Sequence, residues 1–360
     1  MASCPKELIR NGPTKGMQFT RQQAERLFER YFNKKISWFE VCDSGLNNLL
    51  FFIDCENDPQ RYVLKICGNV WTKLKTESEV CAIELVHRHT TIPLPQIIGY
   101  SSDKSNEFEI EWIVMTRLEG KPLRSSSNDK DIWPQLTIQQ QKSIIDQLAQ
   151  YVSQLHFNIP RRNLIGNYQF NGQIGEHSDR MGPWKNYMDY YNDRLQRQIK
   201  TLKEDPLFQP IRDQVLQMIK EFQSLSFPDF KDVENVFTHF DLGVQNLIVN
   251  DENEISGIID WEWAGSYPVC EEYFRSYKPI IYNQQLKEYL YSKLEQFNVQ
   301  TPNTIPHFNL LEKMSDLLLS IVPWYLTSLV NCDHPTVEKE LLVIPDKVKL
   351  ILQQIKLILK

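Results

Sequence analysis

Apolar side chains recur at helical spacing in several stretches of the chain. In residues 20–32 they stand at positions 24, 27, 28, 31 and 32, behind Thr20, which can cap a helix. Residues 137–140, Thr-Ile-Gln-Gln, have the form of a capping box, and the apolar stripe behind them ends near His156. Similar spacing predicts further helices over residues 74–89, 184–199, 211–222, 317–330 and 348–359.

Shorter apolar runs between polar turns predict β-strands. In the first third of the chain they cover residues 38–41, 49–53, 61–66 and 107–115. Residues 247–249 and 255–259 are two further runs, joined by the polar turn Asn-Asp-Glu-Asn-Glu. This last pattern predicts a hairpin.

The predicted hairpin is bordered by residues suited to phosphoryl transfer. His239 and Asp241 precede its first strand, Asn246 stands five residues after the aspartate, and Asp260 follows the second strand. An aspartate can position an acceptor hydroxyl, while an amide oxygen and a second carboxylate can hold Mg²⁺ on nucleotide phosphates. A surface loop with ordinary capping side chains is the alternative. The ordered set, converging at one end of a hairpin, favours a kinase-like site.

Two features of the first third of the chain are candidates for phosphate contacts. Lys65, within the third predicted strand, can reach anions, and Glu79 of the next helix is its preferred carboxylate partner. A turn between the first two strands can offer backbone N–H groups to phosphates, and its candidate residues are Ser44, Gly45, Asn47 and Asn48. The alternatives are a plain hairpin turn, a solvent-facing lysine and a solvated helix glutamate.

A turn at residues 116–122, Thr-Arg-Leu-Glu-Gly-Lys-Pro, follows the strand predicted over 107–115. We expect a hinge between two lobes here, with Met115 and Arg117 as candidate nucleotide contacts because backbone amides at this place can meet a purine edge. The alternative is a surface turn. The expected domains are a nucleotide-binding lobe over residues 1–115, the hinge over 116–122, and a helical catalytic and acceptor-binding lobe over 123–360.

Composition and charge narrow the class of protein. The chain has 360 residues, of which 41% are hydrophobic, and this is enough for two lobes or one large domain. The net charge of −6 gives no electrostatic reason to bind nucleic acid or an anionic membrane. Seven cysteines without metal-ligand spacing indicate reduced thiols, and no signal peptide or membrane span is recognisable. We therefore expect a soluble cytoplasmic protein.

The motifs around the hairpin carry a family resemblance. From about Ser44 to Tyr273 the chain resembles the aminoglycoside phosphotransferase and choline kinase family, and it is most similar to the fungal-type branch. The most specific stretches are THFDLGVQNLIV at 238–249 and GIIDWEWAGSYPVCEEY at 257–273. Weaker agreement lies in SGLNN at 44–48, YVLKI at 62–66, VMTRLEGKPL at 114–123 and LAQYVSQLH at 148–156.

The resemblance implies a role for each matching residue. Asp241 would be the catalytic aspartate, Asn246 and Asp260 would bind Mg²⁺, and Lys65 with its partner Glu79 would contact the α- and β-phosphates. The turn at 44–48 would cover the nucleotide. His239 would brace the catalytic loop and would not act as a base.

This chain departs from the family pattern at two places. Phe240 stands where the family usually has a small residue, and residues 242–245, Leu-Gly-Val-Gln, lack the His-Pro often found there. The segment Asp260-Trp261-Glu262 stands where a protein kinase has Asp-Phe-Gly, and no Ala-Pro-Glu follows it, so small molecules are better candidate substrates than proteins.

The resemblance predicts an α+β, two-lobed, protein-kinase-like fold. Its small N-terminal lobe would hold an antiparallel β-sheet and a helix, and its larger C-terminal lobe would be mostly α-helical. The predicted activity is transfer of the γ-phosphoryl group of ATP, or alternatively GTP, to a hydroxyl of a small metabolite or aminoglycoside-like acceptor with Mg²⁺. We expect a monomer or a weak dimer, with no nucleic-acid or membrane partner. The alternative is a catalytically weak pseudokinase that scaffolds a partner, and the sequence leaves the acceptor open.

Overall fold

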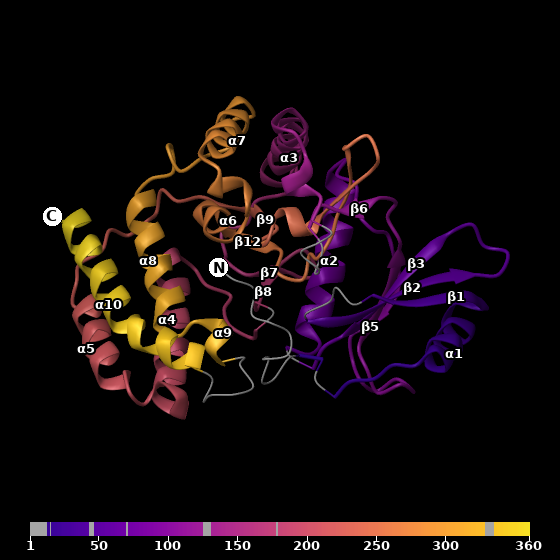
Figure 1. Cartoon of the computed structure of the whole chain (residues 1–360), viewed down its shortest axis with the longest axis horizontal. Helices are drawn as coiled ribbons and strands as arrows, with labels where there is room; N and C mark the ends of the chain where they lie inside the picture. Colours follow the sequence, from indigo (N-terminus) through magenta and orange to yellow (C-terminus); the bar gives the residue numbers. More distant parts are fainter. Residues whose placement is uncertain are drawn as a thin grey trace. The chain divides into compact units, whose positions relative to one another are not determined.

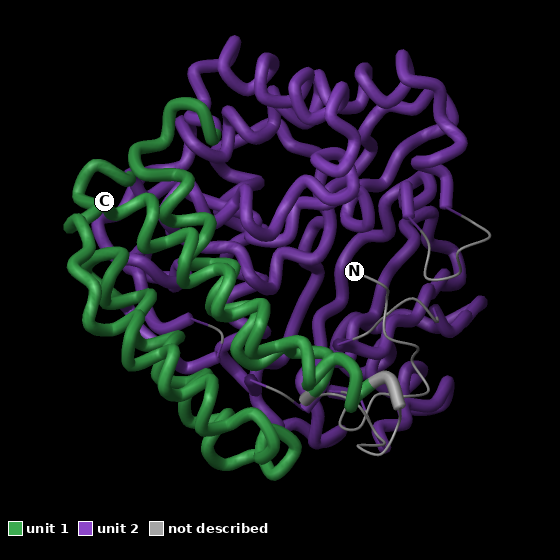
Figure 2. The backbone as a smooth tube through the Cα atoms, turned by 60° about the vertical axis from the view of Figure 1, so that its left-hand side comes forward, with its two compact units in different colours: residues 1–12, 184–233, 302–360 green, residues 13–183, 234–301 purple. Residues whose placement is uncertain are grey.

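The structure is a computed structural model that describes residues 13–14, 16–42, 47–69, 71–124, 131–177, 179–327 and 335–360. The described chain forms two compact units (Figure 2). The first unit, purple in Figure 2, comprises residues 13–183 and 234–301. The second unit, green in Figure 2, is built mainly from residues 184–233 and 302–360. Every described candidate site residue lies in the first unit.

The first unit begins with a five-stranded antiparallel sheet in the order β1-β2-β3-β5-β4 (Figure 1). Its elements are α1 (Arg21–Phe32), β1 (Ile36–Cys42), β2 (Asn48–Cys55), β3 (Arg61–Cys67), α2 (Leu74–His89), β4 (Ile97–Ser101) and β5 (Trp112–Thr116). The predicted antiparallel sheet is confirmed. The strand predicted over residues 107–115 is partly wrong, because Glu109 has a φ of 54° in a turn and the strand begins only at Trp112.

One face of this sheet packs against α1. The helix begins behind Thr20, which caps it as the sequence predicts, and the Thr20 side chain accepts from the Gln23 N–H in a capping box. Leu27 and Phe28 of α1 share one apolar core with residues from β1, β2, β3 and β5, among them Ile36, Phe51, Ile53, Tyr62, Leu64, Ile66 and Val114. The sequence spacing of α1 is therefore explained by burial of one helix face on the sheet.

The rest of the first unit holds the predicted hairpin and several helices. Its elements are β6 (Lys121–Pro122), α3 (Ile138–Phe157), β7 (Asn167–Tyr168), β8 (Ile174–Gly175), β9 (Asn235–Thr238), β10 (Leu247–Val249), β11 (Ile255–Ile258), β12 (Gly265–Pro268), α6 (Val269–Arg275) and α7 (Gln284–Gln296), with 3₁₀ turns at Trp133–Gln135, Val244–Asn246 and Ile280–Tyr282. The hairpin is confirmed, because β10 pairs antiparallel with β11 and Leu247 stands opposite Ile258. β6 adds a short strand on the other side of β10, and β9 pairs with β12. These pairings place the segments before β10 and after β11 at the same end of the hairpin.

The second unit is helical in its described part. Its elements are α4 (Tyr187–Glu204), a 3₁₀ turn at Pro206–Phe208, α5 (Arg212–Gln223), α8 (Phe308–Ile321), α9 (Trp324–Thr327) and α10 (Pro335–Ile358). α10 contacts α8 and α5, and the Tyr191 hydroxyl of α4 donates to the Met314 carbonyl of α8 over 3.0 Å. α10 begins thirteen residues before the helix predicted from residue 348 and contains Pro345. The sheet of the first unit and these helices together confirm the α+β class.

No helix among the residues that the structure describes combines the length and the apolar character needed to cross a bilayer.

Candidate active site

The loop that carries Asp241 leaves β9 through an unusual backbone turn. Phe240 has a φ of 70°, in the left-handed region that non-glycine residues rarely adopt. Its side chain is buried against the Tyr267 ring at 4.5 Å between centroids, and the Arg275 guanidinium lies 4.5 Å from its centroid. The departure from the family at Phe240 is therefore accommodated by packing, and the strain of the turn is held by these contacts.

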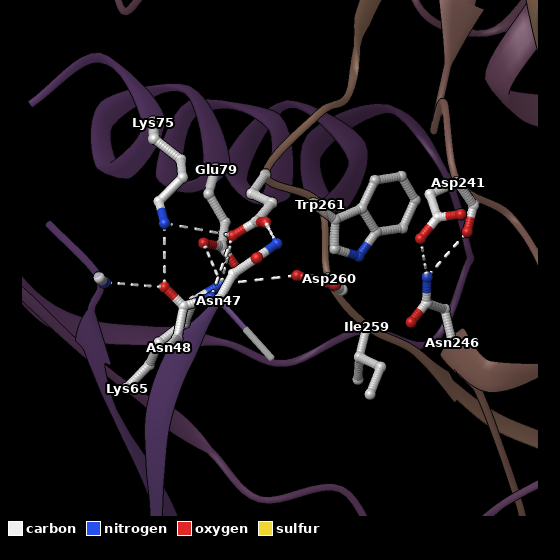
Figure 3. Close-up of polar contacts among 12 residues, drawn as sticks. Asn47, Asn48, Lys65, Lys75, Glu79, Asp241, Asn246, Ile259, Asp260 and Trp261 are labelled. Atoms are coloured by element: carbon white, nitrogen blue, oxygen red, sulfur yellow. Dashed lines mark hydrogen bonds and ion pairs between the residues drawn. The ribbon is translucent and has the colours of Figure 1, made fainter. Parts of the chain in front are cut away.

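Asp241 and Asn246 are in direct contact. The Asn246 side-chain N–H₂ donates to the Asp241 backbone carbonyl over 2.7 Å and to its Oδ2 over 3.2 Å, and Gln245 donates to Oδ1 over 3.3 Å. Figure 3 shows that the amide oxygen of Asn246 points away from Asp241. Burial raises the pKa of Asp241 to about 6, although these two amides favour the carboxylate.

Asp260 lies just beyond β11, at the end of the hairpin where Asp241 and Asn246 meet (Figure 3). Its φ of 66° is a second left-handed position in the site. Its side chain is 37% exposed, and its Oδ1 lies 3.6 Å from Nζ of Lys65. Desolvation and the nearby Glu262 carboxylate raise the pKa of Asp260, while Lys65 opposes that shift.

His239 joins the two segments that border the hairpin. Its Nε2 lies 3.0 Å from the Ile259 carbonyl oxygen, and because a carbonyl only accepts, Nε2 carries the proton. Burial lowers the pKa of His239 to about 4, so the ring is neutral near pH 7. Its backbone N–H donates to Oε2 of Glu272 over 3.0 Å. This geometry fits the brace that the resemblance implies for His239, and not a base.

Lys65 of β3 and Glu79 of α2 form a buried ion pair. Nζ of Lys65 lies 2.6 Å from Oε2 of Glu79, and the two side chains are 5% and 3% exposed. Burial disfavours the ammonium, but Glu79, Glu262 and Asp260 outweigh that effect and raise the pKa of Lys65. The partner chosen from the sequence is therefore the one that the structure brings to Lys65.

Two further charged residues, Lys75 and Glu262, belong to this cluster, and neither is among the site residues predicted from the sequence. Glu262 is fully buried, and its carboxylate lies 3.3 Å from Nζ of Lys65 and 3.8 Å from Nζ of Lys75. Burial alone would raise the pKa of Glu262, but the two lysines and two asparagine amides outweigh it and lower that pKa. Lys75 precedes Glu79 by one helical turn and Glu262 follows Asp260 by two residues, so the spacing places both near predicted site residues but does not identify their partners.

The residues proposed for the phosphate-covering turn fall into two groups. Ser44 and Gly45 lie outside the described residues. Asn47 and Asn48 are described, and their side-chain amides donate to Oε1 and Oε2 of Glu262 over 2.9 and 3.1 Å. The structure therefore brings this end of the turn into the lysine cluster (Figure 3).

Met115 and Arg117 stand near the end of β5, away from the hairpin residues in sequence. Met115 packs in a small core with Val80 of α2. The Arg117 backbone N–H donates to the Arg61 carbonyl over 2.8 Å, and its guanidinium lies 3.9 Å from the centroid of the Phe52 ring. The Arg117 amide is thus engaged by the sheet, and among the described residues no hydrogen bond or ion pair joins Met115 or Arg117 to Lys65.

The donor set fits a magnesium ion bound with nucleotide. Asn246 and the segment before Asp260 meet at this end of the hairpin, where the Ile259 N–H donates to the Asn246 carbonyl over 3.0 Å, and Mg²⁺ prefers oxygen ligands such as the Asn246 amide and the Asp260 carboxylate. Among the described residues, no group of three or more His, Cys, Asp or Glu side chains is arranged to hold a metal. Two protein oxygens are sufficient here, because Mg²⁺ commonly completes its shell with substrate phosphates and water.

The fold is that of the kinase-like phosphotransferases. The chain belongs to the phosphotransferase enzyme family, whose family model matches residues 38–302. A curated relative, the subtelomeric hrmA-associated cluster protein of Aspergillus fumigatus, is 32% identical over 75 residues. That match covers 21% of this chain and 14% of the relative, which is too little to assign a branch of the family.

Several solved structures share the fold at low sequence identity. A macrolide 2'-phosphotransferase type I matches with a TM-score of 0.56 and 14% identity, over 86% of this chain and 96% of its own. The spectinomycin phosphotransferase APH(9)-Ia, in complex with ADP and spectinomycin, gives 0.52 and 12%, over 95% and 99%. The GDP and kanamycin complex of APH(2")-IIia gives 0.54 and 12%, over 93% and 98%.

Proposed function

We propose that this protein transfers the γ-phosphoryl group of ATP or GTP to a hydroxyl of a small molecule. The observation that carries the proposal is the convergence of Asp241, Asn246 and Asp260 at one end of the hairpin, in the same unit as the buried Lys65–Glu79 pair. Family membership supports the reaction class. Because that membership and the complete residue set agree, a non-catalytic scaffold is the less favoured function.

Asp241 is assigned the role of orienting the acceptor and taking its proton. In the transfer, the acceptor oxygen forms a bond to the γ-phosphorus and the bond from that phosphorus to the β,γ-bridging oxygen breaks, which releases the nucleoside diphosphate. The acceptor proton goes to the Asp241 carboxylate. A carboxyl with a pKa near 6 suits this task, because general bases work best with a pKa close to the working pH.

Lys65 is assigned to the α- and β-phosphates, with Glu79 fixing its ammonium. A magnesium ion held by Asn246 and Asp260 would neutralise charge on the nucleotide phosphates. Residues 44–48 would cover those phosphates, and residues 116–122 would form a hinge between a nucleotide lobe over 1–115 and a catalytic lobe over 123–360. Asp260, with a φ of 66°, places its Oδ1 3.6 Å from Nζ of Lys65. The proposed metal ligand and the proposed phosphate contact therefore lie in one region of the site.

The acceptor is the open part of this proposal. Similar solved structures contain kanamycin or spectinomycin, and aminoglycosides are therefore one class to test. Other hydroxyl-bearing metabolites belong in the same screen, because fold alone does not choose an acceptor. A metabolite extract incubated with ATP or GTP, and searched by mass spectrometry for products heavier by one phosphoryl group, requires no prior choice.

The variant Asp241→Asn tests the catalytic assignment. It should lower turnover by about 10²–10⁴-fold, because the acceptor loses its proton acceptor, while MgATP binding is retained. Turnover is measured as nucleoside diphosphate release, and binding is measured as a thermal shift with MgATP. Asp251→Asn makes the same change in the exposed hairpin turn, where the side chain is 94% exposed, and should match the parent. Full turnover in Asp241→Asn would remove Asp241 from the mechanism.

A further inference from the structure

The charged residues around Lys65 form a closed ring of contacts. Nζ of Lys75 donates to Oδ1 of Asn48 over 3.1 Å, and Nδ2 of Asn48 donates to Glu262 over 3.1 Å. Glu262 contacts Lys65 over 3.3 Å, and Lys65 contacts Glu79 over 2.6 Å. Lys75 and Glu79 lie one turn apart on α2, so the helix backbone closes the ring. Four elements of the site are thereby tied together: β2, β3, α2 and the segment after β11.

The ring is balanced in charge and removed from solvent. Two lysines face two glutamates, and all four residues are at most 4% exposed. An uncompensated buried charge is costly, whereas a paired and hydrogen-bonded one is tolerated. The Asp260 carboxylate is a third anion beside this ring, with its Oδ1 3.6 Å from Nζ of Lys65.

The ring also orients the Lys65 ammonium. A lysine ammonium has three N–H donors. Glu79 and Glu262 accept two of them, and the remaining side of the ammonium faces Asp260. In the proposed reaction this is the side on which phosphates and the metal would lie.

The end of the phosphate-covering turn is fixed by the same ring. The Gly68 N–H donates to Oδ1 of Asn48 over 3.2 Å, so this oxygen accepts from both Gly68 and Lys75. A Cβ at Gly68 would lie 2.2 Å from the Asn47 carbonyl oxygen, and only glycine permits this approach of the two backbones. The Lys75 ammonium therefore donates to Asn48 at the place where the backbones of Asn47 and Gly68 pack closely.

We propose that Lys75 is a positioning residue for nucleotide binding. It balances the charge of Glu262 and holds Asn48, and through these two residues it fixes the Lys65 ammonium and the Asn47–Asn48 end of the turn. Lys75 does not itself contact the nucleotide. This inference rests on the proposed phosphotransfer function of the same site.

Three variants and one control test the inference in the full-length protein. Lys75→Met removes the charge at similar length, Glu262→Gln removes the opposing charge, and a third variant combines both. Lys73→Met makes the same lysine substitution at an exposed neighbouring position. Calorimetric titration with MgADP and MgGDP measures nucleotide affinity, and hydrogen exchange of the ligand-free protein measures the Gly68 amide.

Lys75→Met should weaken binding of the nucleotide that the parent binds by about 10–100-fold, as other substitutions behind a ligand contact do. The double variant should lie within about threefold of Glu262→Gln alone, because residues of one network do not contribute additively. In the free protein, Gly68 should exchange about tenfold faster in Lys75→Met than in the parent or Lys73→Met, since a lost side-chain contact lowers local protection. A merely structural lysine would instead lower the melting temperature without changing the affinity of the folded protein.

Three results would overturn the inference. They are parent-like nucleotide affinity in Lys75→Met, affinity losses that multiply in the double variant, and unchanged exchange at Gly68. If the unaltered protein binds neither MgADP nor MgGDP, the proposed function fails. The exchange at Gly68 still decides in that case whether Lys75 holds Asn48, so the two failures are distinguishable.

Discussion

The two faces of the five-stranded sheet contact different kinds of side chains. On one face, Phe28 of α1 packs against Tyr62 of β3 in a core made of aromatic and aliphatic side chains. On the other face, β3 carries Lys65, and α2 brings Val80 together with the charged residues Lys75 and Glu79. Adjacent positions of one strand thus face an apolar core and an ionic cluster, because successive side chains of a strand alternate between faces.

The α1 face of the sheet contributes mainly to stability, whereas the α2 face carries the charged residues of the proposed active site. Burial of apolar area on the α1 face stabilises the fold at about 25 cal/mol per Å². The charges on the α2 face must first lose their hydration, and their mutual attraction offsets that cost only when every partner is present. Such a cluster is weak support for the fold, and in the proposed reaction its role is to orient the Lys65 ammonium. Substitutions on the two faces should therefore affect different measurements.

The largest expected effect is on the stability of the α1 face. Phe28→Ala should lower the free energy of unfolding by about 3–5 kcal/mol, because it leaves a cavity among well-packed rings. Urea denaturation followed by fluorescence measures the change. Glu29→Ala removes an exposed side chain from the same helix and should stay within about 0.5 kcal/mol of the parent. Nucleotide affinity of the folded Phe28→Ala protein should be unchanged, and a weakened affinity would break the separation of the two faces.

The second prediction concerns the ion pair on the α2 face. The double variant Lys65→Met/Glu79→Leu should lose about 10²–10³-fold in turnover, which corresponds to removal of one charged contact to the departing diphosphate. Its free energy of unfolding should equal or exceed that of the parent, because apolar replacements of a buried pair are commonly neutral or stabilising. Diphosphate release and urea denaturation provide the two measurements.

Its control is the single variant Lys65→Met. This change leaves Glu79 buried beside Glu262 without its lysine, so it should destabilise the fold by about 3–5 kcal/mol. If the double variant were as unstable as the single one, the ion pair would itself support the fold, and the contrast between the faces would be wrong.

The sequence predicts those parts of the molecule whose signals are local. The helix cap at Thr20, the capping box at Thr137, the hairpin predicted over residues 247–259 and the strand around Lys65 are confirmed, because each is specified by neighbouring residues. The proximity of Asp241 and Asn246 follows from the same hairpin. The sequence also gives Glu79 as the preferred partner of Lys65, and the two side chains lie 2.6 Å apart.

Other features depend on contacts between residues far apart in the sequence and cannot be predicted from it. Glu262 meets Asn48 across 214 positions, and a buried glutamate has the same local signal as an exposed one. Residues 107–111 alternate polar and apolar side chains as a strand would, yet Glu109 adopts a left-handed backbone in a turn. Arg117 lies in the expected turn, but its amide pairs with Arg61 because the β3–β5 ladder extends one residue further than the apolar run.

The smallest expected effect is at the start of α1. Thr20 is exposed, and its hydroxyl accepts from the Gln23 N–H over 3.2 Å while Gln23 reaches back to the Thr20 N–H over 2.8 Å. Thr20→Ala should lower the free energy of unfolding by about 1 kcal/mol, because one helix N–H loses its partner. Thr20→Ser keeps the oxygen and should restore most of that stability. Nucleotide affinity should be the same in all three proteins when they are folded, because α1 packs on the apolar face of the sheet, opposite to the face that carries Lys65. An affinity that followed the cap, falling in Thr20→Ala and recovering in Thr20→Ser, would mean that order on the α1 face is transmitted through β3 to Lys65.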